Sequence, residues 1–172
     1  IGTERANNAE LGFKSTLWDR RLQLNANLFW TQVNGYQTNA YDEANRVQYL
    51  TNAGSVRSRG VEFDSTLIPL RGLTLNFNGS YNDVSYLSYK DAPCPPETSL
   101  RPGAPASCDL SGHQVVGASK WIANANGEYK WNLANGFEPY VTASYAFRSK
   151  AVGTVEDSDY GQIPAYAVVN LS

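Results

Sequence analysis

Polar and apolar residues alternate along much of this chain with a period of two. This is the pattern of a β-strand that has one wet face and one apolar face. The clearest case is residues 56–82, where two alternating stretches flank Pro69 and Gly72. Because Pro and Gly favour tight turns, we expect a long antiparallel hairpin over 56–82.

The same alternation predicts further strands over residues 8–17, 22–34, 120–131, 137–148 and 164–172. With the two strands of the hairpin, this makes about seven strands. Phe29 is an exception to the pattern, because it lies among the polar positions of its strand.

The connections between these strands alternate strictly in length. Short turns are expected at 18–21, 69–72 and 132–136, and long loops at 35–46, 88–117 and 149–163. A soluble β-sandwich has no reason to place all its long loops at one end, whereas outer-membrane barrels have short periplasmic turns and long extracellular loops. The pattern therefore favours an all-β fold, an antiparallel transmembrane β-barrel with the three long loops outside the cell.

The composition is compatible with a barrel and excludes two other classes of protein. The chain has 11 Tyr, 6 Phe and 4 Trp but only 17% charged residues. It contains no apolar run near the roughly 18 residues of a membrane helix, which excludes a helical membrane protein. The net charge of −2 gives no basic footprint for nucleic acid, so no nucleic-acid partner is expected.

One face of the predicted sheet carries repeated amides. Asparagines recur as pairs two residues apart on three strands, at Asn25 and Asn27, Asn76 and Asn78, and Asn124 and Asn126. A dry core would not tolerate so many amides, but a hydrated or polar-filled lumen would. The alternative, the solvent face of a soluble carbohydrate-binding β-sandwich, stays open at this point.

The barrel interpretation fixes which residues face which way. We expect the lipid side to hold Val61, Phe63, Leu73, Leu75, Phe77 and Ala125, and the lumen side to hold Glu62, Asp64, Asn76, Asn78 and Asn126. Arg57 and Arg59 are expected to pair with the two lumen carboxylates across strands.

Several motifs resemble those of TonB-dependent outer-membrane receptors of the iron-complex type. The main one is Asn52-Ala53-Gly54 followed by Ser58-Arg59-Gly60-Val61-Glu62. Residues 10–15, then Leu28-Phe29-Trp30 and Gln37, look like the hairpin before this motif in the family. Leu73-Thr74-Leu75 with Gly79-Ser80-Tyr81 looks like the strand after it. Residues 108–113 and 118–121 resemble the Asp-Leu-Ser-Gly loop and the strand entry that follows it.

The resemblance implies a plugged barrel of about 22 strands that takes up iron complexes such as ferric siderophores. The energy would come from the TonB complex, and the localisation would be the outer membrane of a Gram-negative bacterium. The chain starts at Ile1 without a signal segment, so residues 1–172 are expected to be a barrel fragment whose plug and last strands are absent. The alternative from the same strands is a passive pore or an adhesin-like barrel.

Cys94 and Cys108 lie in one proline-rich loop that would face an oxidising compartment. We expect a disulfide between them, with two free thiols as the alternative. Together with His113 they match no zinc spacing, so no metal site and no cofactor are expected.

Asp109, Ser111 and His113 are the residue types of a hydrolase triad, but alternate positions in a short loop rarely bring a base to a nucleophile. We expect no enzyme and no catalytic residue. By the resemblance, ligand contacts would come from the plug and from loop residues such as Tyr41, Tyr89, Asp109 and His113.

Overall fold

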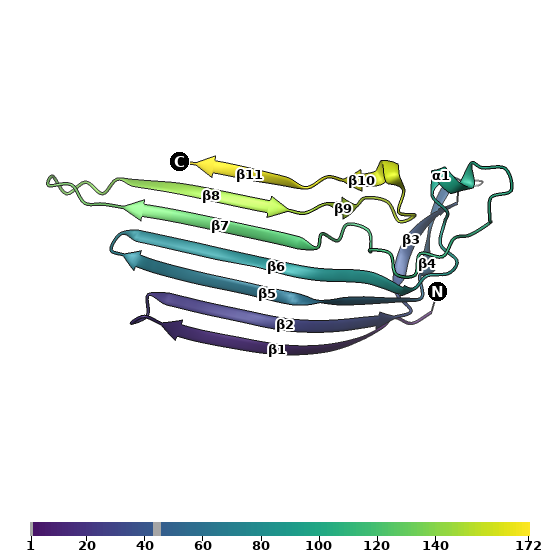
Figure 1. The fold of residues 1–172 in the computed structure, drawn as a ribbon, viewed down its shortest axis with the longest axis horizontal. Helices are drawn as coiled ribbons and strands as arrows, with labels where there is room; N and C mark the ends of the chain where they lie inside the picture. The colour runs from purple at the N-terminus through teal and green to yellow at the C-terminus, as the bar shows by residue number, and fades with distance from the viewer. Residues whose placement is uncertain (1, 43–45) are drawn as a thin grey trace.

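A computed structural model describes residues 2–42 and 46–172, and it is built around one antiparallel sheet (Figure 1). The 7-stranded sheet has the order β1-β2-β5-β6-β7-β8-β11, so neighbours in the sheet follow one another along the chain. Its strands are β1 (Arg5–Leu17), β2 (Leu22–Asn34), β5 (Ser55–Leu70), β6 (Leu73–Ser88), β7 (Trp121–Lys130), β8 (Tyr140–Arg148) and β11 (Tyr166–Leu171). The predicted all-β, antiparallel sheet of about seven strands is confirmed.

The short connections lie together at one end of the sheet and the long ones at the other (Figure 1). At the short end, Trp18, Asp19 and Arg20 take positive φ angles of 53°, 51° and 68°, and Gly72 has a φ of 86°. These left-handed residues close tight turns between strands of 13 residues or 16 residues. The long loops therefore all lie at the same end of the sheet.

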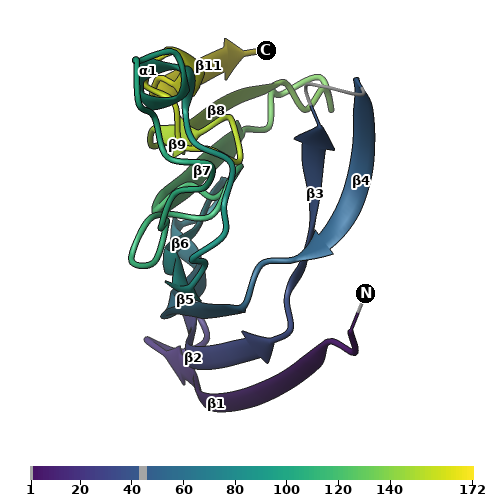
Figure 2. The same cartoon turned by 90° about the vertical axis from the view of Figure 1, so that its right-hand side faces the viewer.

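The first long connection is not the irregular loop that we expected at 35–46. It forms a second small sheet, in which β3 (Gln37–Asp42) pairs with β4 (Val47–Asn52). Gln37, Thr38 and Asn39 are three polar residues in succession, so no apolar face marked this segment as a strand. Figure 2 shows the hairpin rising on the concave side of the curved main sheet, at its long-loop end.

Other details also differ from the sequence prediction: β1 starts at Arg5 rather than at residue 8, and β11 starts at Tyr166 rather than at 164. The sixth strand of the sheet begins at Tyr140 rather than at 137, because Pro139 has no N–H to offer a ladder. The Trp131 N–H instead donates to the Pro139 carbonyl at 3.1 Å. The loop over 149–163 also contains short structure: β9 (Ala151–Val152) pairs with β10 (Gln162–Ile163), and a 3₁₀ turn spans Asp159–Gly161. A single helical turn, α1 (Pro96–Ser99), lies in the loop between β6 and β7.

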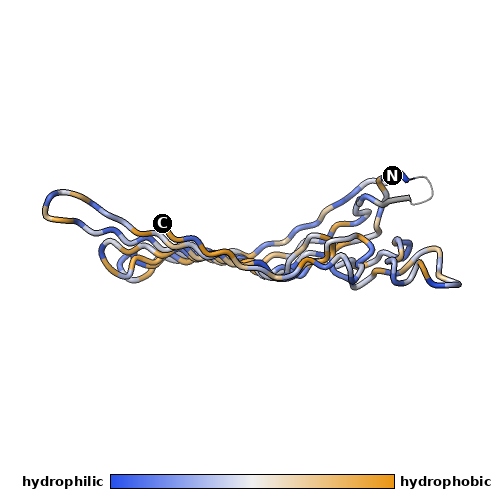
Figure 3. Tube along the Cα trace, turned by 90° about the horizontal axis from the view of Figure 1, so that it is seen from above, coloured by the Kyte–Doolittle hydropathy of each residue, from blue (hydrophilic) through white to orange (hydrophobic). Residues whose placement is uncertain are grey.

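The register places the predicted polar and apolar residues on opposite faces. Residues opposite each other in an antiparallel pair share a face. Ser65, Phe77, Ala125 and Tyr145 form one row across β5 to β8, while Asn25, Asp64, Asn78 and Asn124 form another across β2 to β7. Seen edge-on in Figure 3, the strands make one thin curved layer in which hydrophobic and hydrophilic positions alternate.

The buried core does not lie within the sheet but at its long-loop end. The residues that are nearly inaccessible to solvent there are Ala53, Val56, Tyr86, Tyr89, Ala92, Leu110 and Val115. They come from the connection between β4 and β5, from the ends of β5 and β6, and from the loop over 89–120, which packs back onto these strand ends. The large apolar side chains of the sheet are instead exposed, including Phe13 at 57% and Leu28 at 55%.

Candidate functional site

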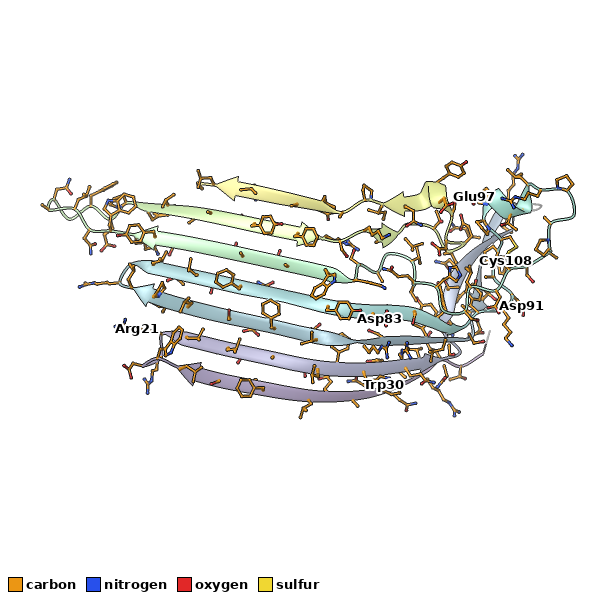
Figure 4. All side chains as sticks on the ribbon, viewed as in Figure 1. Arg21, Trp30, Asp83, Asp91, Glu97 and Cys108 are labelled. Atoms are coloured by element: carbon orange, nitrogen blue, oxygen red, sulfur yellow. A yellow bond between two sulfur atoms is a disulfide. The ribbon has the colours of Figure 1, made fainter. Side chains whose placement is uncertain are left out.

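The loop between β6 and β7 is held in shape by a covalent link and a backbone bridge. Cys94 and Cys108 are joined by a disulfide, with their Cα atoms 5.0 Å apart. Beside it, Ala92 and Cys108 exchange backbone hydrogen bonds of 3.0 and 2.9 Å. Figure 4 shows Cys108 among the densely packed side chains of this end of the molecule. The disulfide and the backbone bridge therefore fix the conformation of this loop.

The segment 109–113 closes this loop through its own side chains. The Asp109 carboxylate accepts the Ser111 N–H at 2.9 Å, while the Ser111 hydroxyl oxygen accepts the Tyr89 N–H at 3.0 Å. Hydrogen bonds from the Ser111 hydroxyl and N–H lower the pKa of Asp109 below its ordinary value. Leu110 between them is 4% exposed and anchors the segment in the core. Asp109 itself stays at the surface.

Side-chain contacts at His113 and Glu97 tie this loop to the loop over 149–163. The His113 Nδ1 atom lies 2.7 Å from Asp157 Oδ2. The Glu97 Oε1 atom accepts the Ser158 hydroxyl at 2.7 Å and the Asp159 N–H at 2.8 Å. The hydrogen bond from the Ser158 hydroxyl is the main cause that lowers the pKa of Glu97. The two loops are therefore held together at the long-loop end of the sheet, which we call its mouth.

Tyr89 is not the ligand-facing residue that we expected. It is 3% exposed, and its ring centroid lies 5.0 Å from that of Tyr86. Burial raises the pKa of Tyr89 above its ordinary value. The Tyr89 ring points inward and packs in the buried cluster with Val56 and Tyr86, at the ends of β5 and β6. Tyr41 lies on β3, and its side chain is outside the described part of the chain.

The polar face of the sheet forms a broad hollow of about 610 Å³. Its polar lining includes Glu10, Lys14, Asn25, Asn27, Glu62 and Asp64. Amides and carboxylates here bond across strands: the Asn25 amide donates to Asp64 Oδ2 at 2.8 Å, and the Asn124 amide donates to Asn78 Oδ1 at 2.9 Å. Such a surface offers donors and acceptors to water, to polar protein segments or to a hydrophilic solute.

The arginine pairing that we expected is wrong. Arg59 does not pair with Glu62 or Asp64 but with Asp83, at 3.2 Å. Arg59 and Asp83 are opposite each other in the register, whereas Glu62 and Asp64 belong to the other face. Parity along β5 thus forbids the predicted pairs.

Asp109, Ser111 and His113 are close in sequence, but the fold does not arrange them as a catalytic triad. The ring of His113 contacts Asp157, and Ser111 is hydrogen-bonded to Tyr89 and Asp109.

Within residues 2–42 and 46–172, no group of three or more His, Cys, Asp or Glu side chains could hold a metal ion. No helix in this described part is long and apolar enough to cross a membrane.

Sequence reasoning missed the residues that clamp the loops. Glu97 follows two prolines in a segment without periodicity, and Asp157 lies 44 residues from His113. A contact between two irregular loops leaves no trace in a period-two pattern. The one available signal was that both loops lie at the same end of the sheet. This predicts that the loops are near each other, but not which residues make contact.

A family model described as TonB dependent receptor-like, beta-barrel, matches residues 2–172. The chain belongs to the TonB-dependent receptor family. The motif that suggested this family at the sequence level has a structural role here. The Asn52 amide donates to the Gly35 carbonyl at 2.6 Å, and its Oδ1 accepts the Gly2 N–H at 2.7 Å. One side chain thus joins the ends of β2 and β4 to the residues before β1 in this receptor-family chain.

Solved receptor structures share the fold. The chain is similar to the ferric yersiniabactin uptake receptor FyuA from Yersinia pestis, with a TM-score of 0.70 and 16% identity over 98% of this chain and 22% of that one. It is also similar to the siderophore receptor PiuA from Acinetobacter baumannii, with a TM-score of 0.67 and 17% identity over 96% of this chain and 21% of that one. A third match is BauA, the ferric preacinetobactin receptor from Acinetobacter baumannii, with a TM-score of 0.67 and 17% identity over 96% of this chain and 22% of that one. The chain therefore spans about a fifth of the length of these receptors.

Proposed function

We propose that residues 1–172 form part of the wall and part of the outer entrance of an outer-membrane receptor that takes up iron complexes. The observation that carries the proposal is the arrangement of the sheet. It has one polar face and one apolar face, and its long loops contact one another at one end of the strands. A membrane wall needs the apolar face toward lipid, and an entrance needs a defined loop surface above a hydrophilic passage.

The edges of the sheet support a larger barrel. β1 and β11 are the outermost strands of the sheet. In hydrocarbon, each unpaired backbone group costs several kcal/mol, so a spanning sheet must be closed. We infer that further strands of the parent receptor pair with β1 and β11, and that a plug domain fills the lumen against the polar face.

The partners follow from the family. The three structural relatives described above are named as receptors for ferric or siderophore ligands. We infer a siderophore-like iron complex as the ligand, with energy supplied by the TonB complex through the part of the receptor that holds its contact segment. Asp109 and His113 remain our candidates for loop residues near the ligand, because both are exposed at the clamped mouth.

Uptake of radiolabelled iron complexes by cells that express the full-length receptor tests this proposal. Uptake should exceed that of cells without the receptor and should vanish when the TonB complex is deleted. Uptake that persists without TonB would identify a passive pore. A receptor that stays in the soluble fraction, without detergent, would support the soluble β-sandwich instead.

A further inference from the structure

The apolar face of the sheet changes character abruptly on approach to the long-loop end. One row across five strands holds Leu11, Leu28, Val61, Tyr81 and Trp121, all apolar or aromatic. The rings of Tyr81 and Trp121 lie 4.7 Å apart, between centroids. Aromatic side chains of this kind mark the level where hydrocarbon meets the headgroups of a bilayer. This row is therefore the upper limit of the apolar band.

The three rows beyond this limit are mostly polar, with Ala9 and Trp30 as the exceptions, and they carry three arginines. The next row holds Ala9, Trp30, Arg59 and Asp83, and the one after it holds Asn7, Gln32, Arg57 and Ser85. A third row holds Arg5, Asn34 and Ser55. Arg5, Arg57 and Arg59, which we call the arginine patch, thus lie on the outward face. The patch extends over two strand spacings, or about 10 Å, across the sheet and over four residues, or about 13 Å, along the strands.

The charge of the patch is only partly neutralised. Among the described residues of these rows, Asp83 carries the one carboxylate. It occupies Nε and one terminal nitrogen of Arg59 at 3.2 Å, which leaves the other terminal nitrogen free to bind. The Nε atom of Arg57 is buried and has no hydrogen-bond partner. The side chain of Arg59 is 54% exposed. Figure 4 shows Trp30 and Asp83 in the half of the sheet nearer the long loops, far from Arg21 at the short-turn end.

We propose that the arginine patch binds the phosphate groups on the headgroup of an outer-leaflet lipid. Guanidinium groups match phosphate in charge and in the geometry of paired hydrogen bonds. The patch continues directly from the apolar band, so a lipid whose chains pack on Leu28 and Val61 presents its headgroup at Arg57 and Arg59. The inference rests on the proposed membrane placement of the receptor, and it concerns lipid on the outside of the wall rather than the transported ligand.

The test uses the full-length receptor reconstituted into nanodiscs of neutral phospholipid. Binding of a fluorescent, phosphorylated lipid A is compared with that of its dephosphorylated form. The double variant Arg57→Gln/Arg59→Gln should weaken binding of the phosphorylated form by about 25-fold, since each basic residue near a charged surface contributes about fivefold. The matched control, Arg21→Gln/Arg71→Gln at the short-turn end, should bind like the wild type.

A second variant guards against misfolding. Arg57→Lys/Arg59→Lys keeps the charge and should retain most of the binding, and wild-type binding should weaken as salt is added. Equal loss in the Arg21 and Arg71 control, or equal affinity for the dephosphorylated lipid, would overturn the proposal. Full displacement of the lipid by free inorganic phosphate would assign the patch to soluble phosphate and would overturn it as well. Iron uptake by the wild-type receptor is measured in parallel, so a receptor that binds lipid but transports nothing contradicts the proposed function alone.

Discussion

The ring of Phe29 lies directly over Gly60 on the polar face of the sheet. The two residues are opposite each other in the pairing of β2 with β5, and a Cβ placed on Gly60 would come within 2.9 Å of Phe29 Cζ. The same Cβ would lie 1.9 Å from the Tyr81 carbonyl oxygen. An aromatic ring that covers a strand glycine pins the register of the two strands. The position therefore needs glycine.

Replacing Gly60 tests this relationship. Gly60→Ala should destabilise the full-length barrel by roughly 1–3 kcal/mol, because the new methyl group overpacks against a carbonyl that cannot easily move. The measurement is urea unfolding in detergent, followed by heat-modifiable gel mobility. Gly12→Ala is the matched control, since its Cβ would meet only Asn27 Oδ1, at 3.9 Å. Equal stability of the two variants would show that the close approach does not constrain the fold.

The assignment of faces can be tested at two neighbouring residues of β6. Leu75 shares its face with Leu67 and Gly127, and Asn76 shares the other with Thr66 and Asn126. If Leu75 faces lipid near the midplane, Leu75→Arg should cost about 2–4 kcal/mol in unfolding free energy, and Asn76→Arg far less. The measurement is reversible unfolding of the full-length receptor in lipid vesicles. Similar costs for both variants would argue against a membrane wall.

The disulfide remains a prediction about the protein in its cell. It closes a loop between residues separated by 14 positions, for which chain entropy gives about 3 kcal/mol. Cys94→Ser/Cys108→Ser should make the loop over 89–120 sensitive to protease while the strands stay resistant. Mass spectrometry after alkylation of unreduced receptor should find neither thiol modified. Two alkylated cysteines would establish free thiols in their place.

Acid should loosen the clamp between the two loops. The pKa of Glu97 is lowered in the folded protein, so its contact contributes stability above its unfolded pKa near 4.5 and loses it as the pH falls through the lower folded value. Protease cleavage within 149–163 should therefore accelerate below about pH 4. Asp109 also has a lowered pKa, so Asp109→Asn serves as the comparison. If Glu97→Gln shows the same acid sensitivity as the wild type, the Glu97 contact is not what responds.

Much of the sheet could be predicted because one face is apolar and the other polar. Along β5 and β6 a one-residue slip would exchange Phe63 with Glu62 and Phe77 with Asn78, so the pattern fixes both register and facing. It also shows why Arg59 could not reach Glu62. Phe29 looked like an error in the pattern, and its reason appears only when Gly60 is seen opposite it.

The mouth of the sheet was much less predictable from the sequence. The β3–β4 hairpin has polar residues on both faces, and a strand without an apolar face gives no period-two signal. Tyr89 looked like an exposed loop residue because nothing local reveals that Leu110 and Val115 return to cover it. Contacts such as His113 with Asp157 depend on two loops meeting in space, which local pattern does not encode.

The topology of the sheet in the membrane is the central claim, and impermeant labelling of intact cells measures it directly. Single cysteines are introduced into the full-length receptor at Leu100 and Tyr160, which are 84% and 87% exposed in the long loops. Matched cysteines are introduced at Asp19 and Asn135 in the short turns, all in a Cys94→Ser/Cys108→Ser background. We expect a membrane-impermeant maleimide to modify the long-loop sites on sealed cells and the short-turn sites only after the outer membrane is permeabilised. Labelling at Asp19 or Asn135 on sealed cells, at the rate seen for Leu100, would contradict the orientation and the barrel wall on which it rests.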